Sequence, residues 1–512
     1  MDWLTLILSL VPGIYLVYYF LWKPLIHFQR LDLPYATPFP ILGNMAPFML
    51  RRTSLFECIE KLYHRFSHAK YFGFYHFTTP VIVIRDPELI TAVTVTNFDH
   101  FCDHHGFVDE ELDPLMGKNL LSLRGDRWRE MRRLLSPIFT SSKMRIMFRL
   151  ISDCADNVTD FVATKSKQGQ VFDTREVFHW YANDVVASCN FGYAVDSMRD
   201  PENQFYAFAK EALNFMSSLS LKFAIGKNFS TISRLLGIKM VNDDARQYFL
   251  RVVADTVKIR EEKGIYRPDM IQLMMESKDK DGKGLTIEEM TCQAFIFFLA
   301  GFDAISSIIC FATHEIAVNP DVQANLYAEI EEVVRKTGEK PTYDSLKSMR
   351  YMDAVVNEVL RLYTSALFLD RVCVKEFEFP PATATSKPII VKPGDIVWYL
   401  PLAIHRDPKY YPEPTRFDPG RFLNVEPTQP TYIPFGLGPR FCIGNRFAIL
   451  ECKVVLFYLL WRCRLEVCNE TQIPMRFSKK SFVLAPEKGF WLKFRTRDEN
   501  YPSRIEGEIK EL

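Results

Sequence analysis

The feature that most limits how this chain folds is the loop Pro434–Gly444, which reads PFGLGPRFCIG. Its glycines allow tight turns and let the backbone approach a bound group closely. The apolar segment that follows predicts a helix from about Ile443 to near Trp461. Cys442 would then precede a helix amino terminus, whose dipole favours a thiolate. The loop must therefore be held in a fixed shape at the start of a long helix.

A thiolate that ligates haem iron needs this kind of setting, because it must lie close to a flat macrocycle. Backbone amides around Cys442 can donate to its sulfur and tune its donor strength. Arg440 is placed to pair with a haem propionate. The competing interpretation is a glycine-rich loop with a buried structural cysteine, which would be preferred for a lone cysteine. The complete pattern Phe-x-x-Gly-x-Arg-x-Cys-x-Gly favours the haem interpretation.

With this loop the chain resembles the cytochrome P-450 superfamily, and the resemblance extends over essentially the whole sequence. It implies a mainly α fold with a small β region, in one large domain. It also implies a haem b whose iron Cys442 holds as the axial thiolate and metal ligand. The other haem contacts that it implies in the loop are Phe435, Gly438, Arg440 and Gly444.

Other segments match the family in the expected order. Glu358 and Arg361 lie three residues apart and share a helix face, and the resemblance adds Arg421 to this pair as a structural ion network. Trp128 and Arg132 resemble the Trp-x-x-x-Arg helix, from which an indole N–H and a guanidinium reach a propionate. The resemblance makes Arg371 a further propionate partner.

The segment Ala300–Ala304 resembles the helix at which the family binds oxygen. Thr286 and Glu289 predict the start of this helix by a capping box, and Asn319-Pro320 predict its end after Val318. The resemblance gives Gly301, Asp303 and Ala304 catalytic positions. Where the family carries a threonine whose hydroxyl organises proton delivery, this chain has Ala304. Ser306 and Ser307 are expected to be poor substitutes, and Asp303 has the alternative of being a structural cap or an ion-pair partner.

The amino-terminal segment from Trp3 to Trp22 carries no charge and is long enough to span a bilayer. Lys23, His27 and Arg30 follow it, which predicts a cytosolic body by the positive-inside rule. No small-residue cleavage site follows, so an uncleaved anchor is preferred to a signal peptide. The expected organisation is a membrane anchor at 1–23, a stiff, extended proline-rich tether at 24–44 and a haem-thiolate catalytic domain at 45–512.

Composition excludes some alternatives. The net charge is +1 and no long basic run occurs, so nucleic acid is not an expected partner. Eleven cysteines without regular pairing indicate a reducing compartment rather than a disulfide framework. Between Arg371 and Pro434 short apolar runs and prolines predict strands and turns, and Val81–Ile84 predicts a buried strand.

The resemblance implies a monooxygenase that inserts one oxygen atom of O2 into lipophilic small molecules. Electrons would come from NADPH through a flavoprotein reductase, with cytochrome b5 as a second possible donor, at the endoplasmic reticulum membrane. The residues around Phe101–His104 and Trp128–Pro137 are most similar to those of insect microsomal members linked to xenobiotic metabolism. Two rivals stay open: a haem-thiolate isomerase or dehydratase acting on peroxides, and a non-catalytic haem protein that sequesters ligands.

Some finer expectations concern surfaces and the pocket. Arg129 and Arg133 are docking charges for the reductase. The segment from Leu213 to Leu236 either dips into the membrane or forms a plain core helix pair. The pocket candidates, named by position alone, are Phe107, Phe298, Ala304 and Phe368.

Overall fold

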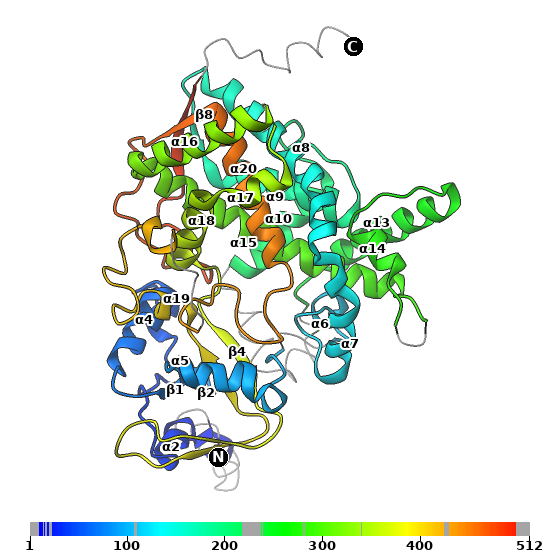
Figure 1. The fold of residues 1–512 in the computed structure, drawn as a ribbon. Helices are drawn as coiled ribbons and strands as arrows, with labels where there is room; N and C mark the ends of the chain where they lie inside the picture. The colour runs from blue at the N-terminus through cyan, green and yellow to red at the C-terminus, as the bar shows by residue number, and fades with distance from the viewer. Residues whose placement is uncertain are drawn as a thin grey trace.

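Helices make up most of the molecule, and its largest sheet lies at the end nearest the amino terminus (Figure 1). The structure is a computed structural model, and it describes residues 10–13, 15, 18–19, 23–106, 110–217, 237, 239–279, 282–338, 340–423 and 430–497. This mainly α architecture with small sheets confirms the predicted fold class. The segment Leu213–Leu236 and Phe107 lie largely or wholly outside the described residues, so the expectations about them stay predictions.

The helix α15, Ile287–Val318, runs through the centre of the molecule. Thr286 and Glu289 form the predicted capping box: the Glu289 N–H donates to Thr286 Oγ1 at 3.2 Å, and the Thr286 N–H donates to Glu289 Oε2 at 2.9 Å. Most side chains of α15 are buried, which explains why the helix is apolar on nearly all faces. It packs against the helices that surround it: α9 (Thr174–Val186), α13 (Asp243–Lys263), α18 (Arg350–Tyr363) and α20 (Asn445–Arg462).

The remaining described helices are α2 (Lys23–Arg30), α3 (Ala46–Met49), α4 (Leu55–Arg65), α5 (Pro87–Thr91), α6 (Pro114–Gly117), α7 (Gly125–Leu135), α8 (Ser141–Ser166), α10 (Gln204–Ser217), α14 (Met270–Glu276), α16 (Pro320–Thr337), α17 (Tyr343–Ser348) and α19 (Pro401–His405). Short π or 3-10 turns are η2 (Ala92–Thr96), η3 (Phe98–His100), η4 (Ser136–Phe139), η5 (Ala187–Phe191) and η6 (Pro419–Phe422).

The largest sheet has the strand order β1-β2-β7-β4, formed by β1 (Tyr71–His76), β2 (Thr79–Ile84), β7 (Ile396–Tyr399) and β4 (Leu369–Val372). Its β2 strand contains the predicted buried run, and it pairs antiparallel with β1 and parallel with β7. A second sheet has the order β3-β9-β8, from β3 (Val171–Asp173), β9 (Trp491–Thr496) and β8 (Cys463–Glu466). The pair β5 (Phe377–Phe379) and β6 (Ile389–Val391) completes the described strands.

The amino-terminal region differs in part from the expected tether. Residues Lys23–Arg30 form helix α2, and the proline-rich segment after it packs on the sheet, where the Gly73 N–H donates to the Pro34 carbonyl at 2.8 Å. Leu33 and Ala36 are buried there. The extended stretch is thus part of the folded body, because its apolar residues Leu33 and Ala36 are buried against the sheet.

The predicted anchor from Trp3 to Trp22 lies largely outside the described residues. Within the part that the structure describes, one helix, Ile287–Val318, is apolar and long enough to cross a membrane. That helix is α15, and 72% of its most apolar window is buried inside the protein, which identifies it as the core helix. The domain boundaries at 23 and 44 stay predictions.

Candidate active site

The cysteine loop is shaped by two glycines in the left-handed region, Gly436 at φ +81° and Gly438 at φ +75°. At Gly438 the conformation coincides with a close approach: a Cβ there would lie 1.8 Å from the Thr94 carbonyl oxygen. The Cys442 N–H donates to the Phe435 carbonyl at 2.9 Å and closes the loop. Gly444, by contrast, has φ −90° and room for a side chain. The loop therefore needs glycine at 436 and 438 for its own fold, as the sequence predicted, and not at 444.

Cys442 differs from the other cysteines. All eleven lie in the part of the chain that the structure describes, and Cys442 is the one that is exposed. It precedes α20, which starts at Asn445. Burial within the protein mass raises the pKa of its thiol, while the Gly444 N–H and the positive charge of Arg132 act in the opposite direction. Cys442 is thus an exposed residue with protein mass around its thiol, which suits a ligand of an enclosed iron.

Three arginines lie in or beside this loop, and their donors are engaged to different degrees. Arg132, from α7, donates from Nη2 to the Phe441 carbonyl at 2.9 Å. Arg440 stacks on Trp128 at 3.9 Å and donates to the carbonyls of Cys102 and Leu123, each at 2.9 Å. Burial, followed by the nearby charge of Arg371, lowers the pKa of Arg440 to about 9.

Arg371 is the most deeply buried of the three, and one of its donors has no partner. It is 1% exposed, it donates from Nη1 to the Asp370 carbonyl at 2.7 Å, and its Nε has no hydrogen-bond partner. Among the described residues no carboxylate forms an ion pair with Arg371 or Arg132, and Arg440 has only Asp103 at 3.4 Å. A buried cation without a partner is costly.

These residues fit a haem. A haem b carries two propionates, which would pair with the excess positive charge around the loop, and the exposed Cys442 sulfur would hold its iron. Arg371 and Arg132 each have N–H groups left that can donate to the propionates. The guanidinium of Arg440 is largely engaged by protein carbonyls, and Trp128 lies beneath it as a stacking partner.

The structure brings Glu358 and Arg361 of α18 together with Arg421 of η6. Arg361 donates from Nε and Nη2 to both carboxylate oxygens of Glu358, at 2.7 and 2.8 Å. Arg421 Nε lies 3.5 Å from Glu358 Oε1. Arg361 also donates to three backbone carbonyls, of His405, Pro414 and Arg416. The network thus fixes the backbone of the segment 405–418 that leads toward the cysteine loop.

On α15, Asp303 has a charged partner that lies far away in the sequence. Arg175 Nη2, from α9, lies 3.1 Å from Asp303 Oδ1, and His179 Nε2 lies 3.9 Å from the same oxygen, too far for a hydrogen bond. Burial opposes the charge of Asp303, but His179 and Arg175 outweigh it and hold the pKa of the carboxyl below its usual range. Asp303 is therefore an ionised, partnered group, as the ion-pair alternative had predicted.

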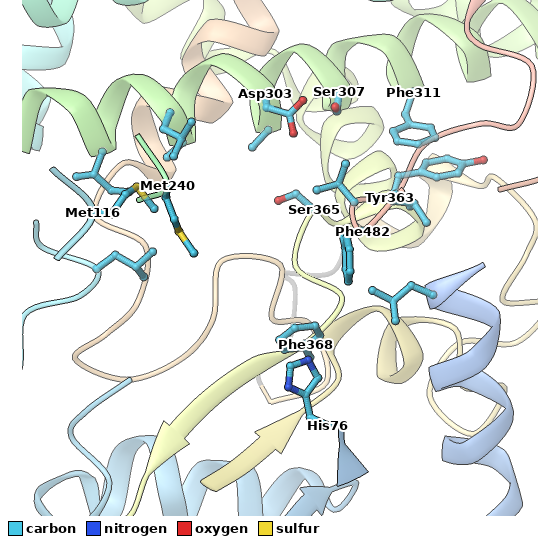
Figure 2. A pocket seen from close by; sticks show the side chains of 18 of the residues that line it. His76, Met116, Met240, Asp303, Ser307, Phe311, Tyr363, Ser365, Phe368 and Phe482 are labelled. Atoms are coloured by element: carbon cyan, nitrogen blue, oxygen red, sulfur yellow. The ribbon is translucent and has the colours of Figure 1, made fainter. Parts of the chain in front are cut away.

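A cavity of about 320 Å³ runs along α15. Figure 2 shows Asp303, Ser307 and Phe311 on the helix facing Phe368 and His76 across it. Its lining is mostly apolar: Met45, Leu55, His76, Met116, Leu121, Met240, Ile296, Leu299, Ala300, Asp303, Ala304, Ser307, Phe311, Tyr363, Ser365, Phe368, Phe482, Val483 and Leu484.

Only some of the predicted pocket residues line this cavity. Ala304 and Phe368 line the cavity. Phe298 does not: it is fully buried in an aromatic cluster with Phe205 and Phe249, so its assignment to the pocket is wrong. Gly301 lies toward α9, where a Cβ would come within 3.1 Å of Val186 Cγ2. Its small size therefore lets two helices approach, and the space in the cavity lies beside Ala300 and Ala304.

Ser307 is the residue that the sequence interpretation undervalued. It lies three positions after Ala304 and lines the same cavity, whereas the Ser306 hydroxyl turns back and donates to the Asp303 carbonyl at 3.1 Å. Residues three apart share a helix face, so the spacing from Ala304 places Ser307 on its face and turns Ser306 away from it.

The cytochrome P450 family model matches residues 33–494 of this chain. The chain belongs to the cytochrome P450 family. It is similar to cytochrome P450 9e2 of Blattella germanica, at 40% identity over 92% of this chain and 94% of the relative. It is also 37% identical to probable cytochrome P450 9f2 of Drosophila melanogaster, over 92% and 95% of the two chains.

Membership in the family gives the chain its chemistry. It is a haem-thiolate monooxygenase that acts on lipophilic substrates, with a cysteine thiolate as the axial ligand of the haem. Its electrons come from NADPH through a reductase. The similarity to insect members agrees with the resemblance found in the sequence, and it favours the monooxygenase over both rivals.

Proposed function

We propose that Cys442 is the axial thiolate and that this enzyme oxidises lipophilic small molecules in the cavity along α15. The supporting observation is that one segment, residues 364–371, contacts both places. Ser365 and Phe368 line the cavity. Thr364 Oγ1 donates to the Pro434 carbonyl at 3.3 Å, and Arg371 Nη2 lies 3.4 Å from the Leu437 carbonyl. A haem held by the loop would thus lie beside the cavity.

The haem, when bound, supplies the iron at which dioxygen is activated. The chain's own residues would orient it and exclude water: Arg371 and Arg132 would pair with the propionates, and the loop that contains Phe435, Gly438, Arg440 and Gly444 would hold it. Most of the cavity wall is apolar, so a lipophilic substrate is desolvated on entry. Asp303, kept ionised by Arg175, is a proton acceptor at the cavity edge.

Ala304 provides the test of this function. A general acid–base relay typically contributes about 10²–10⁴ in rate, so an oxygenase without the usual hydroxyl is expected to lose reduced oxygen as peroxide. Ala304→Thr should therefore raise the amount of product formed per NADPH oxidised. The measurement uses purified reductase, one lipophilic substrate and a parallel peroxide assay.

Ala304→Val is the matched control, because valine has nearly the shape of threonine but no hydroxyl. We expect Val to leave the ratio unchanged or to lower it. If Thr and Val give the same ratio in haem-loaded protein, Ala304 is not a defect in proton delivery. Absence of any NADPH-dependent turnover, combined with turnover of peroxides alone, would favour the isomerase or dehydratase instead.

The proposed setting is the endoplasmic reticulum membrane, with residues 1–23 as a single-pass anchor, 24–44 as the connecting segment and 45–512 as a cytosolic catalytic domain. Lys23, His27 and Arg30 after the apolar segment support this orientation. Cytochrome b5 is proposed as a second electron donor, and xenobiotics as the substrate group. For reductase docking, Arg133 is exposed and forms no ion pair within the described residues, whereas Arg129 pairs with Asp99 at 2.8 Å.

The orientation predicts that the protein carries no N-linked glycans in a eukaryotic host. The sequons start at Asn157, Asn228 and Asn469, and of these Asn157 and Asn469 are exposed on the described surface. Exposed sequons would be available to the glycosylation machinery if the catalytic domain faced the lumen. Their lack of modification would therefore indicate that the domain lies on the cytosolic side. A mobility shift after deglycosylation would contradict the proposed topology.

A further inference from the structure

We infer that Ser307 and Ser365 form a polar anchor that binds an oxygen atom of an otherwise apolar, uncharged substrate. The inference deepens the proposed function, since it takes the cavity along α15 as the substrate site. It concerns the class of substrate: a lipophilic molecule that carries a carbonyl, ether or hydroxyl group, rather than a plain hydrocarbon or a cation.

Two of the polar groups that line the cavity, Tyr363 and Asp303, already have protein partners. The Tyr363 hydroxyl donates to the Glu315 carboxylate, and the Asp303 carboxylate is paired with Arg175 at 3.1 Å. His76 packs against Trp398, with ring centroids 5.1 Å apart. Because the charge of Asp303 is compensated, the cavity offers little attraction to a cationic ligand.

Ser307 is different. Its residue is only 8% exposed, yet its hydroxyl forms no hydrogen bond to any residue that the structure describes, and it lines the cavity. The neighbouring Ser306 shows the usual alternative for a helical serine, a bond back to the helix backbone, here the Asp303 carbonyl. A hydroxyl of a nearly buried residue that has no protein partner can take its hydrogen bond from a ligand in the cavity.

Ser365 approaches the same space from a second element. It follows α18 in the segment that leads to β4, and its side chain is accessible from the cavity. Within the described chain its hydroxyl also has no hydrogen-bond partner. Figure 2 shows Ser307 on the helix and Ser365 on the facing segment, both within the same pocket.

Two hydroxyls from independent elements can orient a ligand as well as bind it. A serine hydroxyl both donates and accepts, so it suits a carbonyl, an ether or a hydroxyl of the substrate. The remaining wall, with Phe311, Phe368 and Phe482, binds the hydrocarbon part. Anchoring the oxygen fixes which carbon is presented for oxidation.

The test compares ligands that differ only in the oxygen: fluorene with 9-fluorenone, and decalin with 2-decalone. Binding to haem-loaded protein is measured by equilibrium dialysis, with the haem spectrum recorded on the same samples. We expect each ketone to bind about 2–10-fold more tightly than its hydrocarbon. Ser307→Ala and Ser365→Ala should each reduce this preference, and the double variant should abolish it.

Ser306→Ala is the control, since Ser306 is buried on the same helix but its hydroxyl bonds to the backbone. It should keep the ketone preference. No preference in the wild type, a preference that survives the double variant, or an equal loss in Ser306→Ala would each overturn the inference. Failure of the proposed function would be seen in a different experiment. A Cys442 variant would then keep an unchanged haem spectrum, independently of the dialysis result.

Discussion

Replacing Cys442 by alanine should abolish the red-shifted absorption band that the reduced carbon monoxide complex of a thiolate-ligated haem shows. The band arises because a thiolate pushes electron density onto the iron. Alanine has no ligand atom, and no other cysteine of the described chain is exposed. The expected change is complete loss of the band.

Cys468→Ala is the matched control for the cysteine substitution. Cys468 is partly exposed and its sulfur lies 3.3 Å from Thr471 Oγ1, in the turn after β8. Its loss should leave the band unchanged. If the band survived in Cys442→Ala, the ligand assignment would be wrong, and if Cys468→Ala lost it as well, the band would report folding rather than ligation.

Local chemistry explains which parts of the fold could be predicted from the sequence. The limits of α15 depend on Thr286, Glu289 and the Asn319-Pro320 step, which act within one helical turn. The turns at Gly436 and Gly438 depend on backbone conformations that glycine adopts readily. Each of these signals lies entirely in neighbouring residues, so the sequence contains all the information needed.

The errors come from helix phase and from distant contacts. Along α15 the cavity is lined by Ala300, Ala304, Ser307 and Phe311, at steps of three and four residues. Phe298 lies two positions before Ala300, on a different face, which is why its assignment to the pocket is wrong. Of the two serines that follow Ala304, only Ser307 lines the cavity on the face that Ala304 shares.

The partner of Asp303 could not be predicted from the sequence. Arg175 lies 128 residues away on α9, and the two meet only because α9 packs along α15. The same holds for Arg440, whose donors are taken by the carbonyls of Cys102 and Leu123. Long-range packing decides which arginine has N–H groups left to bind a ligand. The periodicity of the sequence contains no information about this packing.

The largest expected effect on stability belongs to Glu358. Glu358 and Arg361 are both fully buried and joined by two charge-assisted hydrogen bonds. Removing one partner of such a pair leaves an uncompensated buried charge, which typically costs about 3–5 kcal/mol. Glu358→Ala should therefore lower the free energy of unfolding by about that amount and reduce the fraction of protein that retains haem. Denaturant unfolding and the haem-to-protein ratio measure the two effects.

The exposed pair Glu332–Lys336 on α16 is the control for this substitution, because its two charges lie in solvent. Exposed pairs contribute little to stability, so Glu332→Ala should leave unfolding and haem content unchanged. A double substitution, Glu358→Leu with Arg361→Leu, separates charge from backbone support. It removes the uncompensated charge, but the carbonyls of His405, Pro414 and Arg416 still lose their donor. We therefore expect the double variant to recover only part of the stability, and full recovery would show that Arg361 does not hold the segment before the cysteine loop.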